Sequence, residues 1–147
     1  MGASGIAIDK SRGALRVARR NIRNLQLSDR IKTIRTSFDT PHKFNQKFDI
    51  IVSNPPYIAH NDTRVNIGAT HDPDLALYAD DNGLAAYKSI AKNAHQWLTD
   101  DGKIYLEIGI NQGPDVKDIF IRNSWNLIRS ENDLMDIERV LVFARAH

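Results

Sequence analysis

The sequence predicts an α/β fold with a mostly parallel sheet. Short apolar segments rich in β-branched residues alternate along the chain with amphipathic segments of helical period. The last two apolar segments are separated only by a polar loop, which predicts an antiparallel strand at the carboxyl end. A chain of 147 residues with 41% hydrophobic and 26% charged residues fits a single domain over 1–147 with a core of its own.

The amino-terminal part of the chain predicts a strand, a helix and a second strand. The first strand covers 5–8 and ends at Asp9. Apolar residues at helical spacing then predict an amphipathic helix over 12–25. Its arginines form a basic outer face, which is more commonly solvated than bound to nucleic acid. A β-branched strand at 31–35 follows.

The central part begins with a buried-type strand at 48–52, which runs into two successive prolines. Proline forbids both helix and central ladder pairing, so the strand must end there. The stretch 58–82 has turn residues and little periodicity, and a loop of that length is usually functional or disordered. Apolar residues at helical spacing over 84–98 then predict a helix with one buried face.

The carboxyl-terminal part predicts one more helix and three strands. The expected elements are a turn at 99–102, a strand at 103–108, a helix at 113–123 and strands at 125–129 and 139–144. Pro114 lies in the first turn of the helix, where its missing N–H costs nothing. The polar loop 130–138 joins the last two strands.

Polar or aromatic side chains follow the carboxyl ends of several predicted strands. They are Asp9, Ser37 with Phe38, Asn54, and Glu107 to Gly109. In a parallel sheet these ends meet at one edge, where ligands bind. Asp9 is equally well explained as a partner of ribose hydroxyls and as an aspartate at a helix N-terminus. Phe38 could stack on an adenine ring or belong to the core.

The tetrapeptide Asn54-Pro55-Pro56-Tyr57 carries the most specific signal. The Asn54 amide offers an acceptor and a donor, and a backbone with two prolines offers mostly bare carbonyls. Two acceptors can take the two hydrogens of a planar NH2 group, and the ring of Tyr57 limits its sliding. The simpler interpretation is a turn that only stops the strand.

Composition excludes several classes of site. The chain has no cysteine, so it has no disulfide framework, thiol nucleophile or zinc-thiolate site, and no metal site is expected. No apolar run approaches the roughly 20 residues of a membrane span, and no signal peptide is visible, so a cytoplasmic location is expected. The net charge of +2 permits an RNA partner without indicating one.

Asn54-Pro55-Pro56-Tyr57-Ile58, after a Phe-Asp-Ile-Ile-Val-Ser strand, resembles the catalytic NPPY loop of class I S-adenosylmethionine-dependent methyltransferases that modify planar NH2 groups. Within these, the chain is similar to the HemK/PrmC family, glutamine methyltransferases that act on peptide-chain release factors. Further segments carry the resemblance. They are 6–9, the acidic-Pro segment 72–77, the strand with Leu-Glu-x-Gly at 101–109, and 138–140.

The resemblance implies a Rossmann-like class I methyltransferase sheet and the cofactor S-adenosylmethionine. It implies that Asp9 binds the cofactor's ribose, that Phe38 lies against its adenine, and that Asn54 also borders it. Ser37 stands where the family usually has Asp or Asn to bind the adenine amino group. Asn54 and Pro55 would accept hydrogen bonds from the substrate amide. Pro56 and Tyr57 complete the catalytic loop, with Tyr57 bounding the pocket.

The chain departs from the family by an absence. The family's first strand and its Gly-rich turn precede the position of Ile6 and are not found in this sequence. Without its central strand the sheet is expected to form two halves with exposed edges, which predicts self-association. Two alternatives to the release-factor enzyme remain open: a catalytically incomplete fragment or binding module, and a methyltransferase for the adenine amino group in RNA or DNA.

Overall fold

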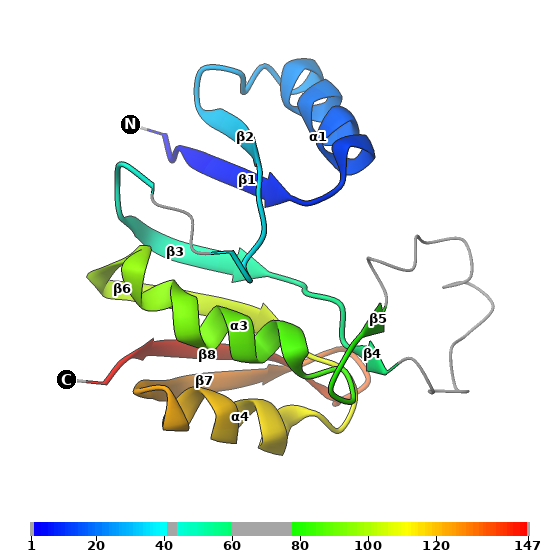
Figure 1. Ribbon diagram of the computed structural model, residues 1–147, viewed down its shortest axis with the longest axis vertical. Helices are drawn as coiled ribbons and strands as arrows, with labels where there is room; N and C mark the ends of the chain where they lie inside the picture. The colour runs from blue at the N-terminus through cyan, green and yellow to red at the C-terminus, as the bar shows by residue number, and fades with distance from the viewer. Residues whose placement is uncertain (1, 41–43, 60–77, 147) are drawn as a thin grey trace. The chain divides into compact units, whose positions relative to one another are not determined.

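A computed structural model describes residues 2–40, 44–59 and 78–146. The chain divides into two compact units, residues 1–42 and 43–147, and each is described by itself. Figure 1 shows the order of the elements along the chain. The acidic-Pro segment 72–77, which the resemblance singled out, lies outside the described residues.

The first unit is a strand, a helix and a strand, as predicted. β1 (Gly5–Asp9) and β2 (Ile31–Arg35) pair in parallel, with Asp9 opposite Arg35. α1 (Arg12–Asn24) begins at Ser11, whose hydroxyl accepts a hydrogen bond from the Ala14 N–H at 3.2 Å. This N-cap satisfies one of the free N–H groups in the first helical turn. Leu15 is the buried residue of the helix, at 2% exposure.

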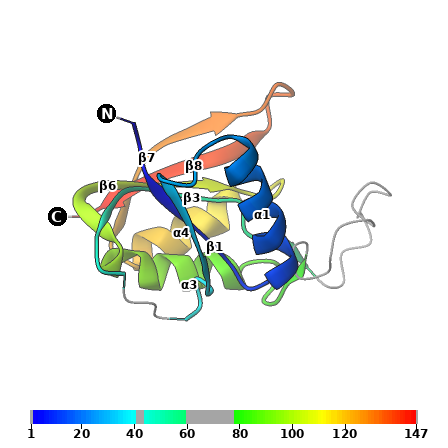
Figure 2. The same ribbon diagram turned by 90° about the horizontal axis from the view of Figure 1, so that it is seen from above.

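The second unit contains a four-stranded sheet. Its order is β3 (Phe48–Ser53), β6 (Leu98–Glu107), β8 (Glu138–Arg145) and β7 (Trp125–Asn132). β3 and β6 are parallel, whereas β8 runs antiparallel to both of its neighbours, which confirms the predicted antiparallel strand. The helices α3 (Ala85–Asn93) and α4 (Gly113–Arg122) lie on the same face of this sheet (Figure 2).

Aromatic side chains fill the core between these helices and the sheet. The rings of Phe120 and Phe143 stack with their centroids 4.3 Å apart. Trp125 is buried, and its indole N–H donates to the Ala91 carbonyl of α3 at 2.8 Å. The ring of His95 stacks on the indole ring of Trp125, with ring centroids 4.0 Å apart. These contacts therefore fix α3 and α4 against β7 and β8.

The predicted helix 84–98 and turn 99–102 were wrong in their bounds. The α-helix ends at Asn93 and continues as the short 3-10 helix η2 (Ala94–Gln96). Leu98 already belongs to β6 because it pairs with Phe48, and the predicted turn is an irregularity within that pairing. A side chain at Gly102 would lie 2.9 Å from Leu98 and 3.1 Å from the Phe48 carbonyl, so glycine lets the backbone pass there.

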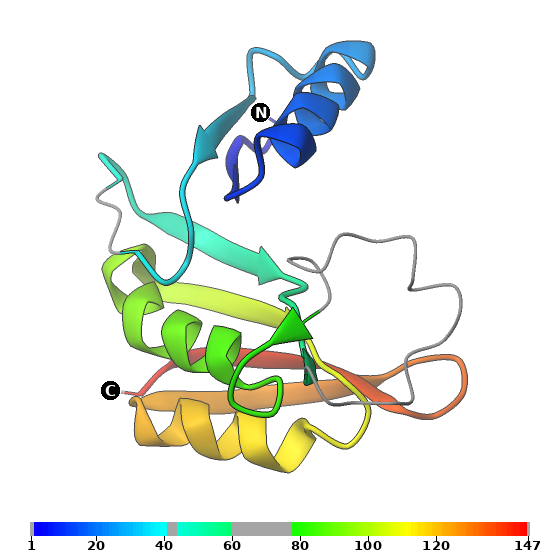
Figure 3. The same cartoon turned by 45° about the vertical axis from the view of Figure 1, so that its right-hand side comes forward.

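Two short strands lie within the segment predicted as a long loop. β4 (Ile58–Ala59) and β5 (Tyr78–Ala79) pair in parallel, and the residues between them, 60–77, are outside the described part of the chain. At the carboxyl end, β7 and β8 form the hairpin seen in Figure 3. Asp133 closes its turn by accepting hydrogen bonds from the N–H groups of Met135 and Ile137.

The described strands pair into separate sheets. β1 and β2 form one sheet, and the four strands of the second unit form another. None of the helices that the structure describes is long and apolar enough to cross a membrane.

Candidate active site

The NPPY loop leaves the sheet of the second unit at the carboxyl end of β3. β3 and β6 pair in parallel up to Ser53 opposite Leu106, so Asn54 lies at the same end of the sheet as Glu107, the last residue of β6. Asn54 is exposed and Pro55 is buried. The buried proline anchors the loop, while the Asn54 amide stays accessible to a substrate.

Gln112 joins this loop to the end of β6. Its Nε2 donates to the Tyr57 carbonyl at 2.9 Å, and its Oε1 accepts from the Gly109 N–H at 3.0 Å. The residue stands at the N-cap position of α4, so the helix start holds its side chain in place. One side-chain amide therefore ties the exit of the NPPY loop to the strand end beside it.

Two glycines leave the space that this arrangement needs. A Cβ on Gly83 would lie 2.1 Å from the Tyr57 carbonyl oxygen, and Gly83 has a φ of +85°. A Cβ on Gly109 would lie 2.6 Å from Oε1 of Gln112 and 3.0 Å from the Tyr57 ring. Real Cβ atoms do not approach so closely, and an L side chain rarely adopts that φ. Both positions therefore require glycine for the loop to pack as it does.

Tyr87 of α3 forms a hydrogen bond with the same end of β6. Its side chain is fully buried, and its hydroxyl donates to the Glu107 carbonyl at 3.0 Å. Burial raises the pKa of Tyr87 far above its ordinary value because the core disfavours the charged phenolate. The hydroxyl therefore stays protonated and acts as a donor.

The first unit holds the residues predicted to bind the cofactor. Asp9 is exposed at the end of β1, and its Oδ1 accepts from the Ser11 N–H at 2.6 Å. One carboxylate oxygen of Asp9 therefore orders the start of α1, and the other takes no hydrogen bond from a described residue. Ser37 is buried, at 7% exposure, and Phe38 is half-buried beside it in the loop that follows β2.

Ion pairing and hydrogen bonding connect the two strand ends of this unit. Lys10 Nζ lies 2.6 Å from Asp39 Oδ2, and the hydrogen bond from Lys10 lowers the pKa of the Asp39 carboxyl. Arg35 Nε donates to the Lys10 carbonyl at 3.0 Å. The loop carrying Asp9 and the loop carrying Ser37 and Phe38 are thereby held together at one edge of the two-stranded sheet.

The predicted site residues thus fall into two groups. Asp9, Ser37 and Phe38 lie together in the first unit, and the NPPY loop lies in the second. Their roles stay predictions. Gln112 and Gly83 were not predicted from the sequence, although an amide side chain just before a Gly-Pro helix start was a possible signal. Tyr87 was predicted only as part of the buried face of the helix over 84–98.

An open carboxylate oxygen on Asp9 and a half-buried ring on Phe38 fit the ribose and adenine of S-adenosylmethionine. A metal site finds no support in the described ranges, which contain no cluster of three or more His, Asp or Glu side chains able to hold a metal ion.

Comparison with known proteins places the chain among methyltransferases. A family model described as Eco57I restriction-modification methylase matches residues 7–108. The release factor glutamine methyltransferase of Streptococcus pneumoniae is 45% identical over 116 residues, which cover 78% of this chain and 40% of that protein. A bifunctional methyltransferase of Rickettsia felis is 42% identical over 142 residues, covering 95% of this chain and 27% of that protein. The chain therefore spans less than half the length of these relatives.

A solved structure supports the fold. The ribosomal protein L11 methylase of Lactobacillus delbrueckii superposes with a TM-score of 0.68 over 98% of this chain and 58% of that one, at 18% identity. At 18% identity this similarity is evidence for the fold alone. It confirms the predicted class I methyltransferase architecture, and the similarity to release factor glutamine methyltransferases confirms the relationship that the NPPY loop indicated.

Proposed function

The chain belongs to the Eco57I restriction-modification methylase family. We propose that it takes part in S-adenosylmethionine-dependent methyl transfer to the side-chain amide of a glutamine in peptide-chain release factors. The observation that carries this proposal is the NPPY loop, with an exposed Asn54 held at a strand end by Gln112. The similarity to release factor glutamine methyltransferases supports the choice of substrate.

Asn54 and Pro55 position the substrate amide. The Asn54 Oδ1 and the Pro55 carbonyl each accept one hydrogen of the substrate NH2 group, which turns the nitrogen's electron pair toward the methyl donor. S-adenosylmethionine, when bound, supplies a methyl group activated by a sulfonium. Positioning of this kind contributes several kcal/mol to a displacement reaction, about 7 kcal/mol or more in favourable cases.

The remaining residues hold this geometry or the cofactor. Tyr57 bounds the substrate amide with its ring, while its carbonyl is fixed by Gln112. Asp9 receives the ribose hydroxyls on its open oxygen, and Phe38 lies against the adenine. None of these groups acts as a strong base. The N–C bond would form as the bond between the methyl group and the sulfonium sulfur breaks, leaving a neutral thioether, and the surplus proton on the methylated nitrogen would pass to water.

Substitution of Asn54 tests the proposal. We expect Asn54→Ala to lower the rate of methyl transfer by about a hundredfold, because the substrate amide loses an acceptor that orients it. S-adenosylmethionine affinity, measured by isothermal titration, should change less than about twofold. Asn126→Ala is the matched control, since Asn126 is an exposed asparagine of β7. Equal turnover of Asn54→Ala and the wild type would refute the role of this side chain.

Two other functions are distinguished by direct assays. Tight binding of S-adenosylmethionine to the chain, measured by isothermal titration, would contradict the alternative of a catalytically incomplete binding module. Methylation of the adenine amino group in nucleic acid is favoured by the name of the matching family model, which is that of a restriction-modification methylase. Transfer of a labelled methyl group to RNA or DNA, and not to a release factor, would establish that alternative.

A further inference from the structure

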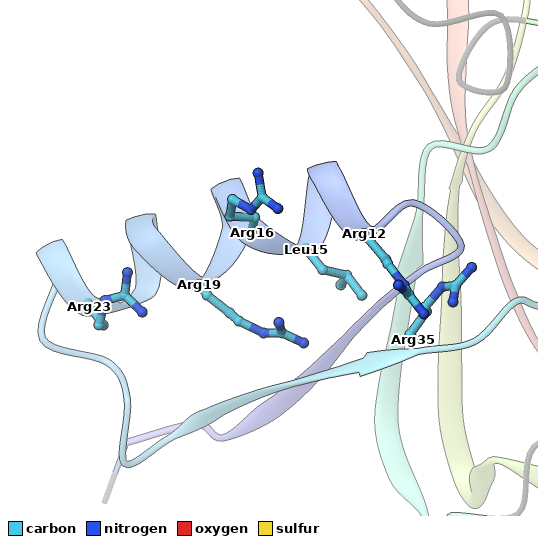
Figure 4. A pocket seen from close by; sticks show the side chains of 6 residues that line it. All are labelled: Arg12, Leu15, Arg16, Arg19, Arg23 and Arg35. Carbon is cyan, nitrogen blue, oxygen red and sulfur yellow. The ribbon is translucent and has the colours of Figure 1, made fainter.

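A groove lined by arginines runs between α1 and β2 of the first unit. Its volume is about 460 Å³, and its lining residues are Arg12, Leu15, Arg16, Arg19, Arg23 and Arg35. Leu15 forms the buried floor, while the five arginines are exposed. In Figure 4, Arg12 extends from α1 toward Arg35 of β2, and Arg19 extends toward the same strand.

The helical arginines form one row along α1. They stand at spacings of four, three and four residues, so they share one face of the helix. Over eleven residues at a rise of about 1.5 Å, the row is about 16 Å long. A single nucleic acid strand carries one phosphate charge per about 3.4 Å of helix axis, so the row faces several phosphates at once.

Two of the arginines are held in place by their Nε atoms. Arg19 Nε donates to the Thr33 hydroxyl at 2.7 Å, and Arg35 Nε donates to the Lys10 carbonyl at 3.0 Å. The terminal NH2 groups of Arg19 and Arg35 make no hydrogen bond to any residue in the described ranges. In each guanidinium these NH2 groups remain available to bind a phosphate. The side chains are thus oriented before a ligand arrives.

The charge of the first unit is unbalanced. Residues 1–42 contain nine Lys and Arg against three Asp, a net charge of +6, whereas residues 43–147 contain eleven against fifteen Asp and Glu, a net charge of −4. Within the part of the chain that the structure describes, no ion pair joins any groove arginine to a carboxylate. Five clustered cations repel one another, and a bound polyanion would relieve that repulsion.

We propose that this arginine groove binds the phosphodiester backbone of a nucleic acid strand. The groove offers guanidinium groups and no aromatic ring among its lining residues, so it contacts phosphates without stacking on bases. Binding is therefore independent of sequence and strongly dependent on salt. The proposal does not rest on methyl transfer to glutamine, and its failure would leave that function untouched.

The test is fluorescence anisotropy with the 147-residue chain and labelled single-stranded RNA or DNA of equal length. Arg16→Gln combined with Arg23→Gln removes two charges from the groove. Arg20→Gln combined with Lys32→Gln is the matched control, because it removes two charges from the same unit at exposed residues that do not line the groove. Labelled poly-glutamate serves as the protein-like polyanion, and circular dichroism verifies that each variant is folded.

We expect a dissociation constant on the order of 10 μM at about 50 mM salt for the wild type. The groove variant should bind about tenfold more weakly, with a salt slope smaller by about 1.4, and the control should stay within about twofold. Tighter binding of RNA than DNA, or of DNA than RNA, would identify the source of the phosphates. Equal weakening by both double variants, poly-glutamate binding as tight as the oligonucleotides, or no binding at about 1 mM chain would overturn the proposal.

Discussion

Substitutions of Gln112 test the two hydrogen bonds that hold the NPPY loop to the end of β6. Gln112→Ala removes both the donor to the Tyr57 carbonyl and the acceptor for the Gly109 N–H. Each bond contributes about 1 kcal/mol, and the buried Gly109 N–H is left without its partner at a further cost of about 1 kcal/mol. We therefore expect a loss of about 2–3 kcal/mol in the free energy of unfolding.

Gln112→Glu isolates the contact with the loop. A glutamate keeps an oxygen for the Gly109 N–H but places its second oxygen where the amide donor faced the Tyr57 carbonyl. Two acceptors then repel each other and displace the loop. The rate of methyl transfer should fall roughly ten- to a hundredfold, because a displacement of about 1 Å can cost that much, while the affinity for S-adenosylmethionine stays the same.

Urea unfolding and steady-state kinetics provide the two assays. With a slope of about 1–2 kcal/mol per molar urea, the loss for Gln112→Ala moves the midpoint by about 1–3 M. Gln96→Ala removes an exposed glutamine of the same unit and should change stability by less than about 0.5 kcal/mol. Wild-type stability in Gln112→Ala, or wild-type turnover in Gln112→Glu, would refute the positioning role.

Two further predictions concern the packing of the second unit. Gly83→Ala should lose about 2 kcal/mol or more in urea unfolding, because its Cβ would meet the Tyr57 carbonyl at 2.1 Å and its φ is +85°. Gly5→Ala, whose Cβ meets nothing within 4 Å, should not share this loss, and equal effects would contradict the packing described. The hydrogen bond from Lys117 to Glu138, at 2.6 Å, holds the pKa of the Glu138 carboxyl below its ordinary value of 4.5. The charged carboxylate therefore stabilises the folded protein at pH values above 4.5, and this stabilisation is lost as the pH falls through the pKa of Glu138 in the folded state. Glu138→Gln should therefore cost about 1 kcal/mol at pH 7 and progressively less as the pH falls below 4.5, and a cost that does not vary with pH would contradict the ion pair.

Sequence patterns predicted the elements whose cause is local. The helix predicted over 12–25 is observed and ends one residue earlier, at Asn24. It could be predicted because its apolar face and its Ser11 cap are both local in the sequence. The strand predicted at 31–35 has the bounds of β2. The start of β6 was missed because Leu98 joins the strand by pairing with Phe48, fifty residues away in sequence. A helical pattern around Leu98 cannot reveal that partner.

The candidate site was predicted in part for the same reason. The NPPY tetrapeptide is a contiguous signal, so its place at the end of β3 followed from the strand before it. Gln112 reaches Tyr57 across fifty-five residues, and nothing in its own neighbourhood indicates that contact. The arginines of α1 were visible as a basic face, but the groove also needs Arg35 from β2, which the helical pattern alone does not supply.

The most direct test of the central claim is to locate the transferred methyl group. The protein is incubated with S-adenosylmethionine and a bacterial release factor, and tandem mass spectrometry identifies the modified residue and atom. We expect a methyl group on the side-chain amide nitrogen of one glutamine, absent when Asn54→Ala replaces the wild type. A methyl group on another residue type, or on added RNA alone, or the same yield from Asn54→Ala, would contradict it.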